Sequence, residues 1–395
     1  MTYDYQQAGR YFAQAPDDIK EIVEAELQSL GGTNVSAGYR GVYFNATPAV
    51  LYAVNYRSQL VSRVLAPLTT FDCHSDKYLY KRASEINWED FLDASRTFAV
   101  FATVSNSTIT HSQFAGLRLK DAIVDYFRSR DGNRPSINTQ DPDVWLNLHI
   151  ERNRATLSVD TSGGSLHRRG YRQDAVSAPM METLAAGIIR LSGWDGSVPL
   201  YDPMCGSGTF LCEAFLYASH KPPGFLRQRF GFERLPDFNA ELWQRVRQES
   251  QKAIVVPPQG LISGSDILAE SVEIARRNLQ RVDPERSISV IRQDVFAMEE
   301  IHGRMIVCNP PYGLRMGRPE EMADFYRRLG DFLKQRCTGS TACVYFGEPE
   351  YLKSLGLKPK WKRSLSNGGL DGVLGFYELF EGYRRHKMRA DYSSV

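Results

Sequence analysis

The second half of the sequence predicts an α/β fold, a doubly wound parallel sheet that ends in an antiparallel hairpin. Apolar strand-like segments alternate with helix-like segments from residue 198 to residue 346, which is typical of a parallel sheet covered on both faces. The turn after the first of these strands contains two closely spaced glycines. Before residue 165, helices and strands follow one another without this alternation, so the first half is predicted to form smaller α+β units.

The first 160 residues predict two such α+β units. The acidic pair Asp17-Asp18 favours the start of a helix, which Gly31-Gly32 ends. The predicted elements are a strand at 10–13, a helix at 17–30, a hairpin at 34–39 and 41–45, a helix at 48–65, a strand at 97–105, a helix at 112–130, and strands at 144–150 and 154–160. Thr161 to Ser165, rich in serine and glycine, is the predicted linker.

The elements of the second half follow in regular order. Strands are predicted at 198–201, 260–265, 287–292, 304–308 and 342–346, with helices at 208–219, 269–281 and 320–336 and a closing hairpin between 361 and 380. A long insertion at 220–258 separates the first helix from the second strand. It contains an aromatic and basic stretch from Phe225 to Phe232.

Composition indicates an ordinary globular protein. A chain of 395 residues predicts two or three domains. No apolar run reaches the ~20 residues needed to cross a bilayer, and the N-terminus has no secretory pattern, so a cytoplasmic protein without a membrane partner is expected. No cysteine belongs to a CxxC pair, so reduced thiols and no metal are expected. No obligate protein partner is evident.

Positive charge is concentrated in the second half. Residues 1–165 contain 16 basic and 19 acidic side chains, and residues 166–395 contain 32 and 27. Basic clusters occur at 167–172, 227–229, 276–281, 327–328 and 384–389. They could follow a phosphate backbone, although each cluster alone is more often a solvated face.

Two short motifs contain the residues suited to chemistry. The first is Asp202-Pro203-Met204-Cys205-Gly206-Ser207-Gly208-Thr209, a strand, glycine turn and helix in the order that a nucleotide-type ligand needs. The second is Asn309-Pro310-Pro311-Tyr312 after an apolar strand. Its two prolines fix the backbone, so that an amide and an aromatic ring are presented rigidly at a strand end. This suits an exocyclic amine on a planar base.

The spacing of acidic strand ends argues against a dinucleotide site. A dinucleotide-binding domain places its acidic residue about 20 residues after the glycine turn. Here 64 residues separate Asp202 from Asp266, because the insertion intervenes.

On these motifs, the chain resembles the class I, S-adenosylmethionine-dependent amino-methyltransferases with a Rossmann-like fold. The segments 167–172 and 178–186, together with Asn309 to Gly313 and Arg315, are similar to the bacterial 23S ribosomal RNA guanine-N2 methyltransferases of the RlmL type. Asn87-Trp88 and residues 120–125 resemble that family's RNA-binding THUMP domain. The fused second methyltransferase domain of some members is not expected, because the sequence ends at Val395.

The resemblance implies a domain order and a cofactor, S-adenosyl-L-methionine. The expected domains are a ferredoxin-like unit at 1–65, a THUMP domain at 66–162, a linker at 163–180 and a methyltransferase domain at 181–390. The implied cofactor residues are Thr183, Asp202, Met204, Cys205, Gly206, Ser207, Gly208, Thr209, Asp266, Ile267, Asp294, Val295 and Asn309. A chain that begins near Ser165 is expected to retain cofactor binding.

Each strand end has an expected role in that pocket. Asp202 meets the ammonium of the methionine moiety, and the amides of Gly206 to Gly208 face its carboxylate. Asp266 accepts from the ribose hydroxyls while Ile267 covers the adenine, and Asp294 accepts from the adenine amine. Asn309 and the Pro310 carbonyl are the expected acceptors for the reacting amine, followed by Pro311 and by Tyr312, which stacks on the base.

The implied substrate is a guanine N2 in 23S rRNA, in the helix 74 region, within naked rRNA or a pre-50S particle. Arg168, Arg169, Arg315 and Lys120 are the expected RNA contacts. The alternatives are a transfer-RNA guanine-N2 methyltransferase, a DNA adenine-N6 methyltransferase, and an RNA-binding assembly factor with a vestigial pocket. Nucleoside analysis of a deletion strain separates them.

Overall fold

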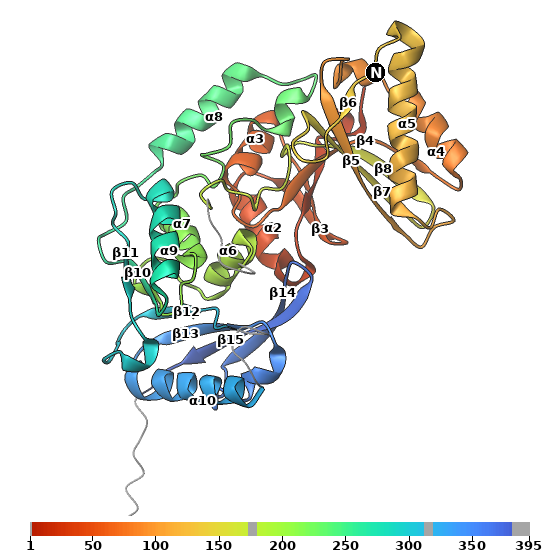
Figure 1. Cartoon of the computed structure of the whole chain (residues 1–395). Coiled ribbons are helices and arrows are strands. Elements are labelled where there is room, and N and C mark those ends of the chain that lie inside the picture. The colour runs from red at the N-terminus through yellow and green to blue at the C-terminus, as the bar shows by residue number, and fades with distance from the viewer. Residues whose placement is uncertain (1, 173–179, 312–318, 381–395) are drawn as a thin grey trace, which may run out of the picture.

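The computed structural model describes residues 2–172, 180–311 and 319–380. Two sheets, one in each half of the chain, form its framework (Figure 1). The first sheet has eight strands in the order β2 (Thr33–Gly38), β3 (Gly41–Asn45), β1 (Arg10–Gln14), β4 (Arg63–Asp72), β8 (Arg154–Asp160), β7 (Val144–Glu151), β5 (Thr97–Ser105) and β6 (Ser136–Ile137).

Five α-helices accompany the first sheet. They are α1 (Asp4–Ala8), α2 (Lys20–Ser29), α3 (Pro48–Arg57), α4 (Asp76–Ser84) and α5 (Ser112–Asp131). Strand β4 pairs with β1 from Arg63 to Leu65 and with β8 from Leu65 to Asp72. The residues assigned to a ferredoxin-like unit and to a THUMP domain therefore share one continuous sheet, and the expected boundary at residue 65 falls inside β4.

The helix predicted at 48–65 is too long. It ends at Arg57, and residues 63–65 already belong to β4. The cause is a distant acid, because the buried Glu26 carboxylate accepts hydrogen bonds from the Ser58 hydroxyl and from the amides of Gln59 and Leu60. Those amides are held in a turn, so the helix cannot continue through them.

The second sheet has the doubly wound topology that the sequence predicts. Its strand order is β11 (Ser289–Arg292), β10 (Ile262–Asp266), β9 (Leu200–Asp202), β12 (Met305–Cys308), β13 (Thr341–Phe346), β15 (Leu370–Glu378) and β14 (Trp361–Asn367). Strands β9 to β13 are parallel, and β15 runs antiparallel to β13. The order reverses between β9 and β12, and a ligand site is expected at the carboxyl ends of these strands.

Helices cover both faces of this sheet (Figure 1). One face packs against α6 (Glu182–Leu191), α7 (Thr209–Ala218) and α9 (Ala269–Val282), and the other against α10 (Pro319–Arg336). Alternate strand residues divide between the two layers: Ile306 packs on the α10 side and Val307 on the α7 side.

The insertion after α7 ties the two halves of the chain together. It contains α8 (Ala240–Lys252), whose Trp243 meets Tyr52 and Tyr56 of α3 edge-to-face, with ring centroids 6.2 and 5.2 Å apart. Arg227 of the insertion donates to the carbonyl oxygens of Ser162, Gly163, Gly164 and Ser165. The predicted linker at 161–165 is thus a packed connection, and Thr161 and Ser162 are fully buried.

Candidate cofactor and active site

The turn between β9 and α7 is built on two glycines with positive φ. Gly206 has φ 52° and Gly208 has φ 80°, values at which other residues are strained. A Cβ on Gly208 would lie 3.2 Å from the Cβ of Ala275 in α9. The turn is therefore pressed against α9, and the Cys205 amide donates to the Ser265 carbonyl at 2.9 Å to hold its other side to β10.

Asp202 ends β9 as a buried carboxylate without a counterion. It is 1% exposed, and its Oδ1 accepts from the Met204 amide at 3.1 Å. Burial raises the pKa of Asp202 well above its usual value. Within the described residues, no lysine, arginine or histidine forms an ion pair with it. A buried acid in this situation suits a ligand that brings its own ammonium group, as S-adenosylmethionine does.

Asp266, at the end of β10, fastens the glycine turn. Its Oδ2 accepts from the Gly206 amide at 2.9 Å, and its Oδ1 accepts from the Leu268 amide at 3.0 Å. Each oxygen keeps a second lone pair for a ligand hydroxyl. Ile267, the next residue, is 55% exposed, as expected of an apolar side chain left available to a ring.

Asp294 follows β11 on the same edge of the sheet. The Gln293 amide donates to the Asp266 carbonyl at 3.0 Å and so links the ends of β10 and β11. Asp294 is half-buried, and its carboxylate accepts from the Phe296 amide at 2.9 Å. Val295 beside it is buried. The structure thus brings the three predicted acidic strand ends to one edge.

Asn309 follows β12, the strand beside β9. The structure leaves its Oδ1 buried without a hydrogen-bond donor among the described residues. An unsatisfied buried amide oxygen costs free energy of the order of 1–3 kcal/mol, and a donor on a bound ligand is one way to recover it. Pro310 is buried beside it. Tyr312 and Arg315, named from the sequence, lie outside the described residues.

The remaining predicted cofactor residues lie in the turn and the start of α7, apart from Thr183 in α6. Thr183 of α6, Cys205, Ser207 and Thr209 are buried, and Met204 is half-buried. Burial raises the pKa of the Cys205 thiol, and burial and the carboxylates of Asp202 and Asp266 raise that of Cys308. Both thiols therefore stay protonated, which agrees with direct methyl transfer without a cysteine nucleophile.

One RNA expectation is wrong. Arg169 is 1% exposed, and its guanidinium pairs with Glu213 of α7 and donates to the carbonyls of Leu166 and Gln59. A fully enclosed arginine cannot reach a phosphate. Arg168 is exposed, and Lys120 is half-exposed with its ammonium 3.1 Å from the Asp121 carboxylate.

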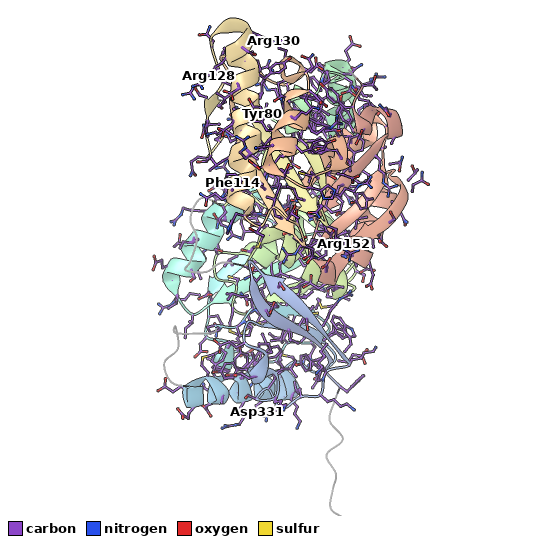
Figure 2. All side chains as sticks on the ribbon, turned by 90° about the vertical axis from the view of Figure 1, so that its right-hand side faces the viewer. Tyr80, Phe114, Arg128, Arg130, Arg152 and Asp331 are labelled. Atoms are coloured by element: carbon purple, nitrogen blue, oxygen red, sulfur yellow. The ribbon has the colours of Figure 1, made fainter. Side chains whose placement is uncertain are left out.

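The surface of α5 offers aromatic and basic groups, many of them paired with acids. Figure 2 shows Phe114 near one end of this helix and Arg128 and Arg130 at the other. Phe114 is 47% exposed. Arg130 lies 3.0 Å from Glu89 and also over the Tyr126 ring. Arg118 and Arg128 likewise lie beside acids, namely Asp76 and Asp125.

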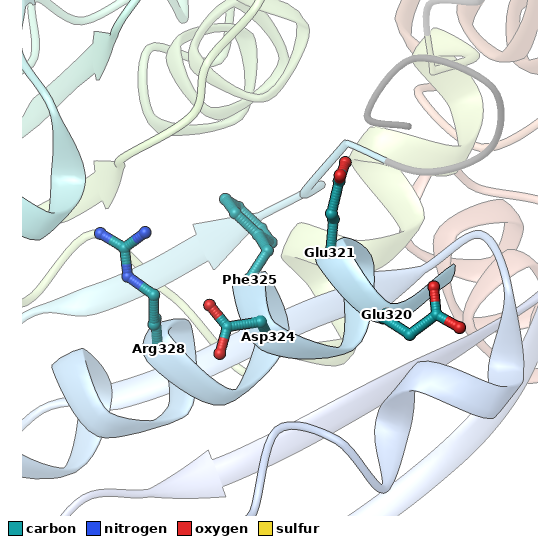
Figure 3. A pocket seen from close by; sticks show the side chains of 5 residues that line it. All are labelled: Glu320, Glu321, Asp324, Phe325 and Arg328. Carbon is teal, nitrogen blue, oxygen red and sulfur yellow. The ribbon is translucent and has the colours of Figure 1, made fainter. Parts of the chain in front are cut away.

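A groove of about 420 Å³ lies along α10, where Phe325 and Arg328 both contact the Phe296 ring, two residues after Asp294. It is lined by Glu320, Glu321, Asp324, Phe325 and Arg328, and Figure 3 shows Glu321, Phe325 and Arg328 projecting from one side of the helix. Three carboxylates against one guanidinium do not suit an anionic ligand. None of the predicted cofactor residues lines this groove.

Sequence reasoning missed a set of ionic side chains behind the turn, namely the buried Glu182 and Glu213 and the partly buried Arg172. Arg172 and Glu182 stand in the segments that carry the family resemblance, and Glu213 lies within an otherwise apolar helix. A single acid in such a helix is the signal that points to a buried partner.

This fold and site define a class I methyltransferase that uses S-adenosylmethionine. The sequence matches the RMKL-like methyltransferase domain over residues 169–374, the THUMP domain over 73–160 and the RlmL ferredoxin-like domain over 10–65. The chain belongs to the RMKL-like methyltransferase family.

Relatives cover nearly all of the chain. The Synechocystis sp. protein slr0064, named provisionally as an RNA methyltransferase, is 37% identical over 94% of this chain and 97% of its own length. A ribosomal RNA large subunit methyltransferase K/L from Syntrophotalea carbinolica is 37% identical over 94% of this chain and 54% of its own. The chain therefore spans about half the length of that relative.

A solved structure supports the assignment of S-adenosylmethionine as the cofactor. The structure of SMU.472 complexed with SAH superimposes with a TM-score of 0.82 at 27% identity, over 94% of this chain and 98% of that one. SAH is what remains of S-adenosylmethionine after methyl transfer. In the part of the chain that the structure describes, no helix is long and apolar enough to cross a membrane, and no group of three His, Cys, Asp or Glu side chains is placed to hold a metal ion.

Proposed function

We propose that this protein transfers a methyl group from S-adenosylmethionine to the N2 amine of a guanine in 23S rRNA, in the helix 74 region. The observation that carries the proposal is the unpaired, buried Oδ1 of Asn309 at the end of β12. Among the described residues it has no donor, and it stands beside the strand whose end holds Asp202. An exocyclic amine supplies the missing N–H.

When bound, S-adenosylmethionine supplies an electrophilic methyl group on a sulfonium. The protein's residues then have to position the amine and polarise it. Asn309 Oδ1 accepts one N–H in the plane of the base, and this contact draws electron density onto the nitrogen as it attacks. Asp202 offsets the ammonium at one end of the cofactor, Asp266 accepts from the ribose, and Asp294 accepts from the adenine amine. No strong base is needed, since the nitrogen becomes acidic once it is alkylated.

The first half of the chain supports an RNA substrate. A THUMP match covers residues 73–160, and the K/L relatives are named for large-subunit ribosomal RNA. Recognition of folded RNA depends on shape and backbone contacts, so a THUMP region set apart from the second sheet suits a structured substrate better than a free nucleoside (Figure 1). Arg168 and Lys120 remain proposed contacts.

Mass spectrometry of nucleosides from purified 23S rRNA and tRNA tests the proposal in a strain that lacks this protein. The proposal predicts that one N2-methylguanosine disappears from 23S rRNA and returns with the intact gene but not with an Asn309→Ala copy. Loss of N2-methylguanosine from tRNA instead, or of N6-methyladenosine, contradicts the substrate assignment. An unchanged nucleoside profile contradicts an enzymatic role.

A further inference from the structure

The inference concerns Arg172, which approaches the glycine turn from behind. Its Nη2 donates to the Thr209 hydroxyl oxygen at 3.1 Å and to the Met180 carbonyl at 2.8 Å. Its Nε lies 3.1 Å from the Glu182 carboxylate. Glu182 itself is 5% exposed, at the start of α6, which lies beside α7 (Figure 1).

The hydrogen-bond donors of the Arg172 guanidinium determine how the Thr209 hydroxyl is oriented. A guanidinium has donors and no acceptor, so the Thr209 oxygen must accept from Arg172. Its own proton is therefore left to donate to a different acceptor. Among the described residues, the Ser207 hydroxyl at 3.4 Å is the acceptor that the structure offers, and this distance is at the outer limit of a hydrogen bond.

Thr209 is the first residue of α7, where unpaired backbone amides and the helix dipole favour an anion. The same turn presents the buried Asp202, with which no described lysine, arginine or histidine forms an ion pair, and this carboxyl calls for a cation. An ammonium and a carboxylate on one carbon meet both needs. Of the parts of S-adenosylmethionine, only the methionine end has this pair.

We propose that Arg172 is a positioning residue for the cofactor: held by Glu182, it fixes Thr209 as a hydroxyl donor to the carboxylate of the methionine end. The inference rests on the cofactor site assigned above and deepens it. Arg172 acts through Thr209 and does not need to touch the ligand.

A series of ligands separates this role from a general structural one. S-adenosylhomocysteine has the amino-acid end, whereas 5′-methylthioadenosine has the same adenosine and sulfur without it. Calorimetry on the intact chain is expected to show that Thr209→Val and Arg172→Gln each lower the affinity for S-adenosylhomocysteine about tenfold. The affinity for 5′-methylthioadenosine is expected to stay within about twofold of that of the unaltered protein. Because Arg172 acts through Thr209, the double variant is expected to be no weaker than either single one.

Arg190→Gln is the matched control. It removes one positive charge from α6, where Arg190 lies over the Tyr217 ring at 4.6 Å, and is expected to change neither affinity. The inference would be overturned if Thr209→Val lowered the affinity for both ligands equally or left both unchanged. It would also be overturned if the losses of affinity were additive in the double variant. Thr209→Val keeps the side-chain volume, so the test stands even if Arg172→Gln does not fold. Failure of the unaltered chain to bind S-adenosylhomocysteine would instead overturn the cofactor site itself.

Discussion

At the scale of single residues, Asp202 is the clearest conflict between stability and function. Burial makes its ionised form unfavourable, and no described side chain compensates that charge. A carboxyl whose pKa is raised on folding binds its proton more tightly in the folded state. The tighter proton binding therefore contributes free energy in favour of folding at low pH. This contribution is lost as the pH rises from the pKa of Asp202 in the unfolded chain through its pKa in the folded protein.

The Asp202→Asn variant is predicted to stabilise the unliganded protein at neutral pH and to lose about 2–3 kcal/mol of affinity for S-adenosylhomocysteine, the size of a charge-assisted contact. The ligand's ammonium favours the carboxylate, so binding to the unaltered protein releases a proton below the unliganded pKa of Asp202. Affinity should rise with pH up to that pKa, and Asp202→Asn should abolish the rise. Thermal unfolding and calorimetry in two buffers measure both effects. An unaltered pH profile in the variant would contradict the role of Asp202.

Asp266 is predicted to need its charge as well as its shape. Asp266→Asn keeps one acceptor oxygen for the turn amides but weakens the contact with the ribose hydroxyls, at an expected cost of about 1–2 kcal/mol in affinity for S-adenosylhomocysteine and for 5′-methylthioadenosine alike. Adenine, which lacks the ribose, serves as the control ligand and should be unaffected. A loss confined to S-adenosylhomocysteine would place Asp266 at the amino-acid end instead.

At the scale of elements, the glycine turn depends on both its backbone and its neighbour. Gly208→Ala is predicted to destabilise the protein by about 2 kcal/mol and to weaken S-adenosylhomocysteine, because alanine is strained at φ 80° and its Cβ meets Ala275 at 3.2 Å. Gly260→Ala is the matched control, since Gly260 has φ 81° with open space around an added Cβ. It should cost only about 1 kcal/mol and leave binding intact. Equal effects of the two changes would show that contact with α9 is unimportant.

The sequence predicted most elements because their patterns are local. The strand at 97–105 and those beginning at Val144 and Arg154 agree with β5, β7 and β8, and the order of the second sheet follows from the strand–helix alternation. The acidic residues at 202, 266 and 294 were expected on one edge because the carboxyl ends of parallel strands coincide. Their roles toward the ligand remain predictions.

What the sequence could not show depends on distant partners. The end of α3 is set by Glu26, which is 32 positions from Ser58. Arg169 stands in a basic cluster typical of a surface, yet its partner Glu213 lies 44 residues away inside an apolar helix. Local charge patterns contain no information on such pairings. Helices α6 and α8 were also not predicted, although α8 has an amphipathic pattern and the capping residue Asn239.

At the scale of the whole molecule, the N-terminal unit is part of the catalytic body. Arg169 links Glu213 of α7 to the Gln59 carbonyl, and Gln59 donates to the Glu213 carbonyl at 3.2 Å. The closing hairpin reaches back to the first helices, where the Ser366 amide donates to Asp18 at 2.8 Å. A chain that begins near Ser165 would expose this buried network, so the expectation that it retains cofactor binding is not supported.

The buried pair of Arg169 and Glu213 is predicted to contribute far more to the free energy of unfolding than the exposed pair of Arg363 and Glu21. Arg169→Met leaves the Glu213 charge enclosed without its partner, at an expected cost of about 3–5 kcal/mol in the free energy of unfolding. Arg363→Gln breaks only the ion pair with Glu21 at the rim, 2.8 Å long, and should cost less than about 1 kcal/mol. Denaturant unfolding compares them. Similar costs would mean that the two halves are joined mainly by their surfaces.

The most direct test of the central claim is methyl transfer by the purified chain to protein-free 23S rRNA, followed by nucleoside mass spectrometry. The unaltered protein is predicted to form N2-methylguanosine at one site. Asn309→Ala should form at least about a hundredfold less in a single turnover, yet bind S-adenosylhomocysteine as the unaltered protein does, because its amide oxygen acts on the attacking amine. Near-normal transfer by Asn309→Ala, or a product other than N2-methylguanosine, would contradict the account.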